Sequence, residues 1–97
     1  MKLGDLKKIA QVFKQFSNID SVLIFGSRAM GNDKKGSDVD LVLMGDIDLS
    51  TLNKVKFLLN EETPLPYFFD VVIYNEIENQ ELKNHIDRYG KIIYTKD

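Results

Sequence analysis

Three short apolar runs constrain the fold of this chain more than any other feature. Each run has four consecutive apolar residues, and polar or turn-forming segments separate them: Val22–Phe25, Leu41–Met44 and Val71–Tyr74. Runs of this length are typical of buried strands, and they fall far short of the roughly 20 residues that span a bilayer. The sequence therefore predicts a small sheet and no membrane-spanning segment.

Length and composition agree with one small globular domain. The 97 residues are 43% hydrophobic and 29% charged, and they contain no cysteine. The absence of cysteine excludes disulfide scaffolds and cysteine-ligated metal centres. The net charge of −2 lacks the basic excess expected of a general nucleic-acid-binding protein. We predict a single cytoplasmic domain over residues 1–97, because no apolar signal core follows the first residues.

Apolar residues at helical spacing predict helices around these strands. The first helix covers residues 2–17. A second begins at a cap on Asp48 or Ser50, and the last opens with the capping pair Asn75 and Glu78. The residues expected to face inward are Leu3, Leu6, Ile9, Ala10, Phe13 and Phe16 in the first helix, Leu49, Leu52, Val55, Leu58 and Leu59 in the second, and Ile77, Leu82, Ile86 and Tyr89 in the last.

The strand pattern completes the expected fold. Strands are predicted over Ser21–Phe25, Asp38–Met44 and Tyr67–Tyr74, and Lys91–Thr95 adds a short edge strand after a helix that ends at Gly90. The third of these is apolar on both faces, which favours a central position in the sheet. The fold class is therefore α/β (α+β), a small mixed β-sheet flanked by helices.

The segment after the first strand has the composition of an anion-binding turn. Gly26 allows a tight turn and a close approach to a ligand, and Ser27 adds a hydroxyl donor. Backbone N–H groups at the start of a following helical turn would bind a phosphate. The alternative is an ordinary Gly-Ser turn with no ligand.

Asp38 and Asp40 lie at the start of the second predicted strand. Alternate residues of a strand share a face, so both carboxylates project together while Val39 and Leu41 point to the other face. Two like charges this close favour a bound cation, and an all-oxygen site suits Mg²⁺ or Mn²⁺. The alternative is a polar strand start without a metal.

Asp70 is the single charged residue between Tyr67 and Tyr74. We expect it to be buried, and a buried carboxylate needs a cation, a network of donors or a raised pKa. The alternative is an aspartate at the edge of the sheet, paired with a lysine or an arginine.

Taken together, these features indicate phosphoryl or nucleotidyl transfer. A phosphate-binding turn with three carboxylates on neighbouring strands could hold two cations about 3.5–4 Å apart around a displacement at phosphorus. Arg28, Lys34 and Lys35 flank the turn and could contact the phosphates, although lysines in such a loop are commonly solvated. The single histidine, His85, has no second ligand nearby in the sequence, so a zinc site is not expected.

The two motifs resemble the signature of the polymerase-β-type nucleotidyltransferases, and the size resembles their minimal (MNT, MntA-like) branch. The residues that carry the resemblance are Gly26-Ser27-Arg28-Ala29-Met30-Gly31 and Ser37-Asp38-Val39-Asp40-Leu41. The resemblance implies the palm-type fold of that family. It also implies that Asp38, Asp40 and Asp70 are catalytic carboxylates and ligands of two Mg²⁺ ions, with Mn²⁺ as the alternative, and that Gly26, Ser27 and Arg28 bind the nucleotide.

The same resemblance implies a substrate and a partner. It predicts transfer of a nucleoside monophosphate, from ATP or another nucleoside triphosphate, to an acceptor hydroxyl. The acceptor is expected on a small helical HEPN-type toxin that docks near Arg28–Lys35, with this chain as the antitoxin. The alternatives are a non-catalytic antitoxin that acts by contact, a transferase with a small-molecule acceptor, and a metal-binding domain without turnover. A second copy of the chain could also complete the site, and neither a membrane nor a nucleic acid is expected as partner.

Overall fold

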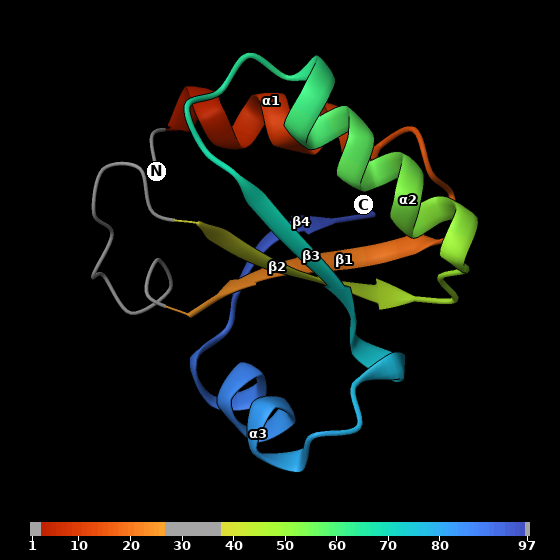
Figure 1. Ribbon diagram of the computed structural model, residues 1–97, viewed down its shortest axis with the longest axis vertical. Coiled ribbons are helices and arrows are strands. Elements are labelled where there is room, and N and C mark those ends of the chain that lie inside the picture. Colours follow the sequence, from red (N-terminus) through yellow and green to blue (C-terminus); the bar gives the residue numbers. More distant parts are fainter. Residues whose placement is uncertain (1–2, 27–37, 97) are drawn as a thin grey trace.

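The computed structural model describes residues 3–26 and 38–96, and it contains four strands among helices (Figure 1). In chain order the elements are α1 (Leu3–Phe13), β1 (Ile19–Phe25), β2 (Val39–Gly45), α2 (Leu49–Phe57), the π-helical turn η1 (Leu58–Glu62), β3 (Phe69–Ile73), the 3₁₀ turn η2 (Tyr74–Glu76), α3 (Gln80–Tyr89) and β4 (Lys91–Thr95). No helix in the described part of the chain is long and apolar enough to cross a membrane.

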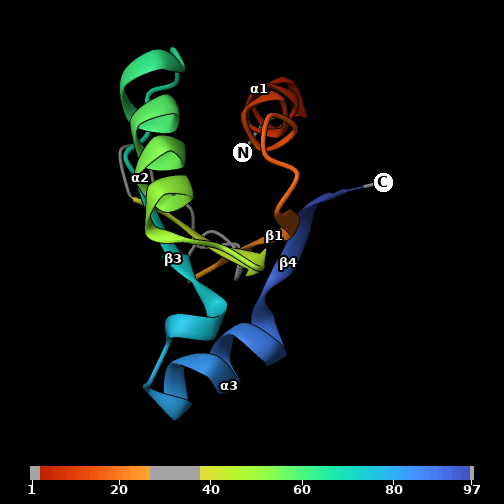
Figure 2. The ribbon, with the colours of Figure 1, turned by 90° about the vertical axis from the view of Figure 1, so that its right-hand side faces the viewer.

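The strands form one mixed sheet in the order β3-β2-β1-β4. β1 pairs antiparallel with both β2 and β4, whereas β2 and β3 are parallel. Helices α1 and α2 cover one face of the sheet, and α3 covers the other (Figure 2). The predicted fold class, a small mixed sheet flanked by helices, is confirmed, as is the edge position of Lys91–Thr95.

The predicted central position of the third strand is wrong, because β3 is an edge strand. Its apolar character has another cause. Val71 is only 2% exposed, since α2 packs over that face of the strand, and Val72 joins the smaller core cluster on the face covered by α3. An edge strand that is covered by helices on both faces has the same sequence pattern as a central one.

Alternation along β2 separates the two faces of the sheet. Val39, Leu41 and Leu43 are fully buried in the main core beneath α1 and α2. Val42 points the opposite way and packs with Phe25 and with residues of α3. The predicted orientation of Val39 and Leu41 is therefore confirmed.

The helices differ from the prediction mainly at their ends. α1 stops at Phe13 rather than at residue 17, and tighter turns follow it, in which Phe16 N–H donates to the Phe13 carbonyl (3.1 Å). Phe16 nevertheless packs against the core. Leu3, expected to face inward, is exposed in the first turn of α1.

The second helix, α2, begins at one of the two predicted caps. One residue of its predicted inner face is exposed. The Asp48 carboxylate accepts a hydrogen bond from Thr51 N–H (2.8 Å), so Asp48 and not Ser50 caps α2. Leu49 was expected to face inward but is 68% exposed. The first residue of a helix next to an exposed cap lies outside the packed turns, whatever its polarity.

The last helix begins later than predicted. Asn79 caps it by accepting from Leu82 N–H (3.1 Å), whereas the Asn75 amide donates to the Gly45 carbonyl (3.2 Å). The predicted capping pair Asn75 and Glu78 is therefore wrong, because a 3₁₀ turn and a short extended segment follow β3. Tyr89 is also exposed rather than inward-facing, while Gly90 ends the helix as predicted.

Candidate active site

Two of the predicted carboxylates face each other across neighbouring strands. In the parallel pairing of β2 with β3, Asp40 lies in register with Asp70. Register-matched residues on adjacent strands project to the same face, and neighbouring strands are about 4.8 Å apart. Both carboxylates share the face that carries Val42 and Val72, which is the face covered by α3. The sheet therefore brings Asp40 and Asp70 side by side where β2 and β3 begin.

Asp38 lies one residue before β2 and is exposed. Its charge still reaches Asp40. The pKa of the half-buried Asp40 carboxyl is raised above its ordinary value, first by burial and then by the negative charges of Asp70 and Asp38. A carboxylate that lies close to two other negative charges is stabilised when a cation binds beside it.

Gly26 closes the other side of Asp40. It follows β1 with a φ of +78°, a conformation that glycine adopts without strain. A Cβ atom at this position would come within 2.5 Å of the Asp40 Oδ2 atom. The backbone conformation therefore favours glycine, and an added Cβ atom would displace the Asp40 carboxylate. The other predicted nucleotide-binding residues, Ser27 and Arg28, lie outside the described residues, as do Lys34 and Lys35.

The expectation that Asp70 is buried is wrong. Asp70 is exposed, because the edge position of β3 opens its side chain to solvent. Its exposure removes the desolvation cost that led us to require a partner. This position matches the alternative of an aspartate at the edge of the sheet. No lysine or arginine of the described residues forms an ion pair with Asp70, and the ion pair among those residues joins Lys96 to Asp20 (4.0 Å).

The oxygen donors of the three aspartates decide whether this site suits a divalent cation. Residues 3–26 and 38–96 contain no group of three histidine, cysteine or acidic side chains that closes around one point. Two aligned carboxylates, with a third one exposed nearby, nevertheless provide the hard oxygen donors that Mg²⁺ and Mn²⁺ prefer. The side-by-side placement of Asp40 and Asp70 is the observation that favours such an ion. The residues present therefore fit the predicted metal as a site that substrate oxygens would complete.

His85 has a packing role. Its ring lies edge-on to Phe25, with 6.5 Å between the ring centroids, and contacts Tyr89 at 5.2 Å. Phe25 is the residue on β1 that pairs with Asp40. His85 thus supports the apolar side of the site.

The sequence analysis missed Asn60, which bonds to the residue before Asp70. Asn60 Nδ2 donates to the Phe69 carbonyl (3.0 Å), and Phe69 N–H donates to Asn60 Oδ1 (2.8 Å). A lone asparagine nine residues away carries no recognisable signal. Only its place between an interrupted helix and a strand could have drawn attention to it.

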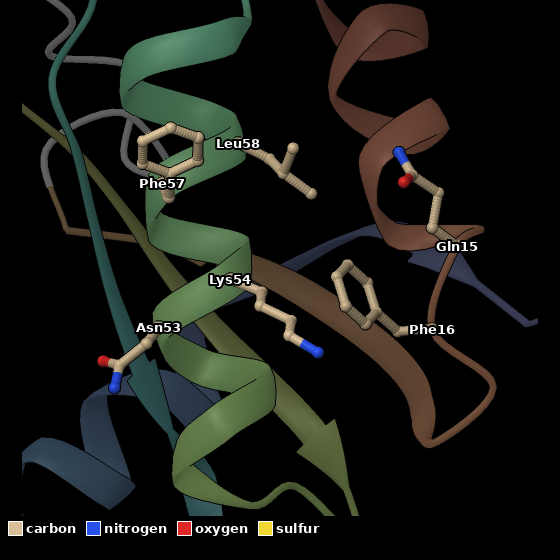
Figure 3. A pocket seen from close by; sticks show the side chains of 6 residues that line it. All are labelled: Gln15, Phe16, Asn53, Lys54, Phe57 and Leu58. Carbon is tan, nitrogen blue, oxygen red and sulfur yellow. The ribbon is translucent and has the colours of Figure 1, made fainter.

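Two hollows of the described surface lie away from the carboxylates. One, of about 450 Å³, is a groove between α1 and α2 on the opposite face of the sheet (Figure 3). Another, of about 690 Å³, runs along the free edge of β3 past Val71 and Ile73, between Leu52 of α2 and Leu82 of α3. Asp40 and Asp70 line neither of them.

The sequence matches the family model described as "Polymerase beta, Nucleotidyltransferase" over residues 7–97. The chain therefore belongs to the polymerase beta nucleotidyltransferase family, and the resemblance carried by its two motifs is confirmed.

Known proteins agree with this assignment. A Methanocaldococcus jannaschii protein named "Putative protein adenylyltransferase MJ0604" is 31% identical over 71 residues, which are 73% of this chain and 65% of that protein. The match thus spans just under two thirds of the relative's length. A chain in the crystal structure of a toxin–antitoxin with AMP-PNP superimposes with a TM-score of 0.76 at 18% identity, covering 93% of this chain and 73% of that one. A chain in the structure of the tri-AMPylated Shewanella oneidensis HEPN toxin in complex with MNT antitoxin superimposes with a TM-score of 0.72 at 16% identity. The match covers 98% of this chain and 73% of that one. At these identities the two structures show a shared fold.

Proposed function

We propose that this chain is a Mg²⁺-dependent nucleotidyltransferase that moves AMP from ATP to a hydroxyl group of a HEPN-type partner protein. The observation that carries the proposal is the alignment of Asp40 with Asp70 beside Gly26. Membership of the nucleotidyltransferase family supports the reaction class. The adenylyltransferase name of the M. jannaschii relative and the AMPylated HEPN toxin beside an MNT antitoxin support the donor and the acceptor.

In this proposal Asp40 and Asp70 hold the cation, and Asp38 adds charge at its outer side. A divalent ion bound there would neutralise the developing negative charge at phosphorus. Gly26 leaves room for the nucleotide phosphates because it presents no side chain next to Asp40. Ser27 and Arg28 complete the phosphate contacts.

The transfer itself needs little from the protein besides position and charge. The acceptor oxygen forms a bond to the α-phosphorus of ATP, and the bond to pyrophosphate breaks. Asp70 is the exposed carboxylate on the open side of the site, and we assign to it the acceptance of the hydroxyl proton. The exposure of Asp70 at the sheet edge suits this role, since an acceptor from another chain can reach it.

The test is co-expression with a HEPN-type candidate partner, followed by intact mass measurement of that protein. The expected result is an AMP adduct on the partner with the wild-type chain and none with Asp40→Asn. Asp46→Asn is the matched control, because Asp46 is an exposed carboxylate at the opposite end of β2.

Two results would contradict the proposal. An unmodified partner that nevertheless binds and is neutralised equally by wild type and Asp40→Asn would favour an antitoxin that acts by contact. An adduct that forms equally with Asp40→Asn would remove the carboxylate pair from the reaction.

A further inference from the structure

We propose that Asn60 is a positioning residue for the transfer reaction, one that fixes the backbone of β3 so that Asp70 stands opposite Asp40. The inference rests on the proposed function and deepens it. Its basis is the pair of hydrogen bonds between the Asn60 amide and the Phe69 peptide groups, at 2.8 and 3.0 Å.

The direction of the peptide groups along β3 explains why these bonds matter. Val39 N–H of β2 donates to the Phe68 carbonyl (2.9 Å), so Phe68 directs its polar groups toward β2. In a parallel ladder the next residue directs its N–H and carbonyl the other way. At the free edge of the sheet those of Phe69 have no neighbouring strand. The Asn60 amide takes the place of that strand at this one residue.

Asp70 directly follows this double contact. On one side the backbone is bound to β2 through Phe68, and on the other it is bound to Asn60 through Phe69. An edge strand that is paired on one side only can shift or peel away more easily than one that is held on both sides. The Asn60 contact therefore restrains the part of β3 that sets the position of the Asp70 carboxylate.

Asn60 is itself held firmly. It lies in the π-helical turn η1, next to Leu59, which is 1% exposed and packs in the main core. The Thr63 hydroxyl donates to the Leu58 carbonyl (2.7 Å) and closes the same turn. A group can position another only if it is fixed, and π-turns are frequent at functional sites.

The experiment compares Asn60→Ala with a matched control, Asn18→Ala. Asn18 is also half-buried and also makes two hydrogen bonds through its amide, to the Asp46 carbonyl (3.2 Å) and the Thr51 hydroxyl (3.0 Å). It lies at the other end of the sheet, where Ile19 pairs with Gly45. Both variants lose two hydrogen bonds, but only one of them touches the strand of Asp70.

Three readouts separate positioning from stability: the kinetic constants, amide hydrogen exchange and Mn²⁺ broadening. We expect Asn60→Ala to lower kcat for transfer from Mg-ATP by about 10–100-fold, the range typical of residues that orient a metal ligand. The KM for ATP should stay within a few fold, because the nucleotide contacts lie elsewhere. Amide hydrogen exchange should accelerate at Phe69 and Asp70, and titrated Mn²⁺ should broaden the Asp70 amide resonance less than in wild type. Asn18→Ala should leave all three unchanged even if it melts at a similarly reduced temperature.

Asn60→Asp serves if the alanine variant does not fold. It keeps an oxygen that accepts from Phe69 N–H but puts a carboxylate oxygen, which cannot donate, against the Phe69 carbonyl, so an effect in the same direction is expected. The role of Asn60 is overturned if either folded variant matches Asn18→Ala in kcat and in Mn²⁺ broadening. A wild-type chain that transfers nothing contradicts the proposed function instead, and Mn²⁺ broadening at Asp70 then decides the role of Asn60. If the wild type lacks this Mn²⁺ broadening at Asp70, the positioning role of Asn60 is overturned.

Discussion

Helices α1 and α2 cover one face of the sheet and α3 covers the other (Figure 2). The first face is closed by a continuous apolar core, whereas the second is only partly apolar and carries the carboxylates. The difference appears between adjacent residues of β2. Leu41 is 0% exposed on the first face, and Asp40 is half-buried on the second, with Asp70 beside it.

The comparison teaches that one short strand can supply stability and chemistry at once. Since successive side chains point to opposite faces, a strand that anchors the fold through one face holds rigid backbone for a site on the other. Substitutions at neighbouring positions should therefore have opposite consequences, and four predictions test this separation.

Asp40→Asn should have the largest effect, a loss of transfer of at least about 100-fold, the scale seen when a preorganised charge-stabilising group is removed. The fold should be kept and slightly stabilised at pH 7, because the pKa of Asp40 is raised in the folded protein and its ionised form is disfavoured there. Lowering the pH through the raised pKa toward about 4 protonates wild-type Asp40 and should remove the difference. Pyrophosphate release at pH 7 measures the first effect, and melting temperatures at pH 7 and at about pH 4 measure the second. A destabilised variant would mean that Asp40 contributes to folding stability, as the residues beneath α1 and α2 do.

Leu41→Ala should do the reverse and destabilise the domain by about 2–5 kcal/mol, because it empties a fully buried position in the main core. Urea unfolding measures this change. Leu49→Ala is the control, since Leu49 is 68% exposed and its loss should cost less than about 0.5 kcal/mol. Similar costs for the two leucines would contradict the packing described for the first face.

Gly26→Ala should affect both stability and transfer. The positive φ alone costs about 1 kcal/mol or more for a residue with a Cβ atom, and that atom would also meet Asp40 Oδ2. The second part of the cost should shrink when Asp40 is also replaced by alanine. A double-mutant cycle on unfolding free energies measures this coupling. Strictly additive effects on the free energy of unfolding would show that a Cβ atom at position 26 does not interact with the Asp40 side chain.

Asp48→Ala should have the smallest effect, a modest fall in the melting temperature at pH 7 through loss of the α2 cap. The pKa of Asp48 is lowered, mainly by its hydrogen bonds with Thr51. The stabilisation is therefore present above the unfolded value, near pH 4, and fades as the pH falls through the folded one. Thermal melts of wild type and variant between pH 7 and pH 3 follow it. Ser50→Ala is the control, and an equal effect there would return the cap to Ser50.

The local parts of the site could be read from the chain, and the remote parts could not. Asp38, Asp40 and Gly26 belong to short motifs whose spacing follows strand and turn geometry, so they were recognisable. Asp70 was found for a wrong reason, as a buried charge, because an apolar strand at a covered edge looks central. Asn60 gave no signal, since its function depends on which residue of β3 lies against it.

The amino-acid sequence was enough to predict the alternation of faces along β2, a helix cap at Asp48 or Ser50, the end of α3 at Gly90 and the family. Each of these follows from residues close together in the chain, where spacing and backbone preference decide the structure. Three features depend on tertiary structure: β3 lies at the edge of the sheet, Asp40 and Asp70 share one register, and Asn60 bonds to the free edge of β3 next to Asp70. These three depend on pairing between distant segments, and pairing is selected by the total burial and hydrogen bonding of the whole domain rather than by any one segment.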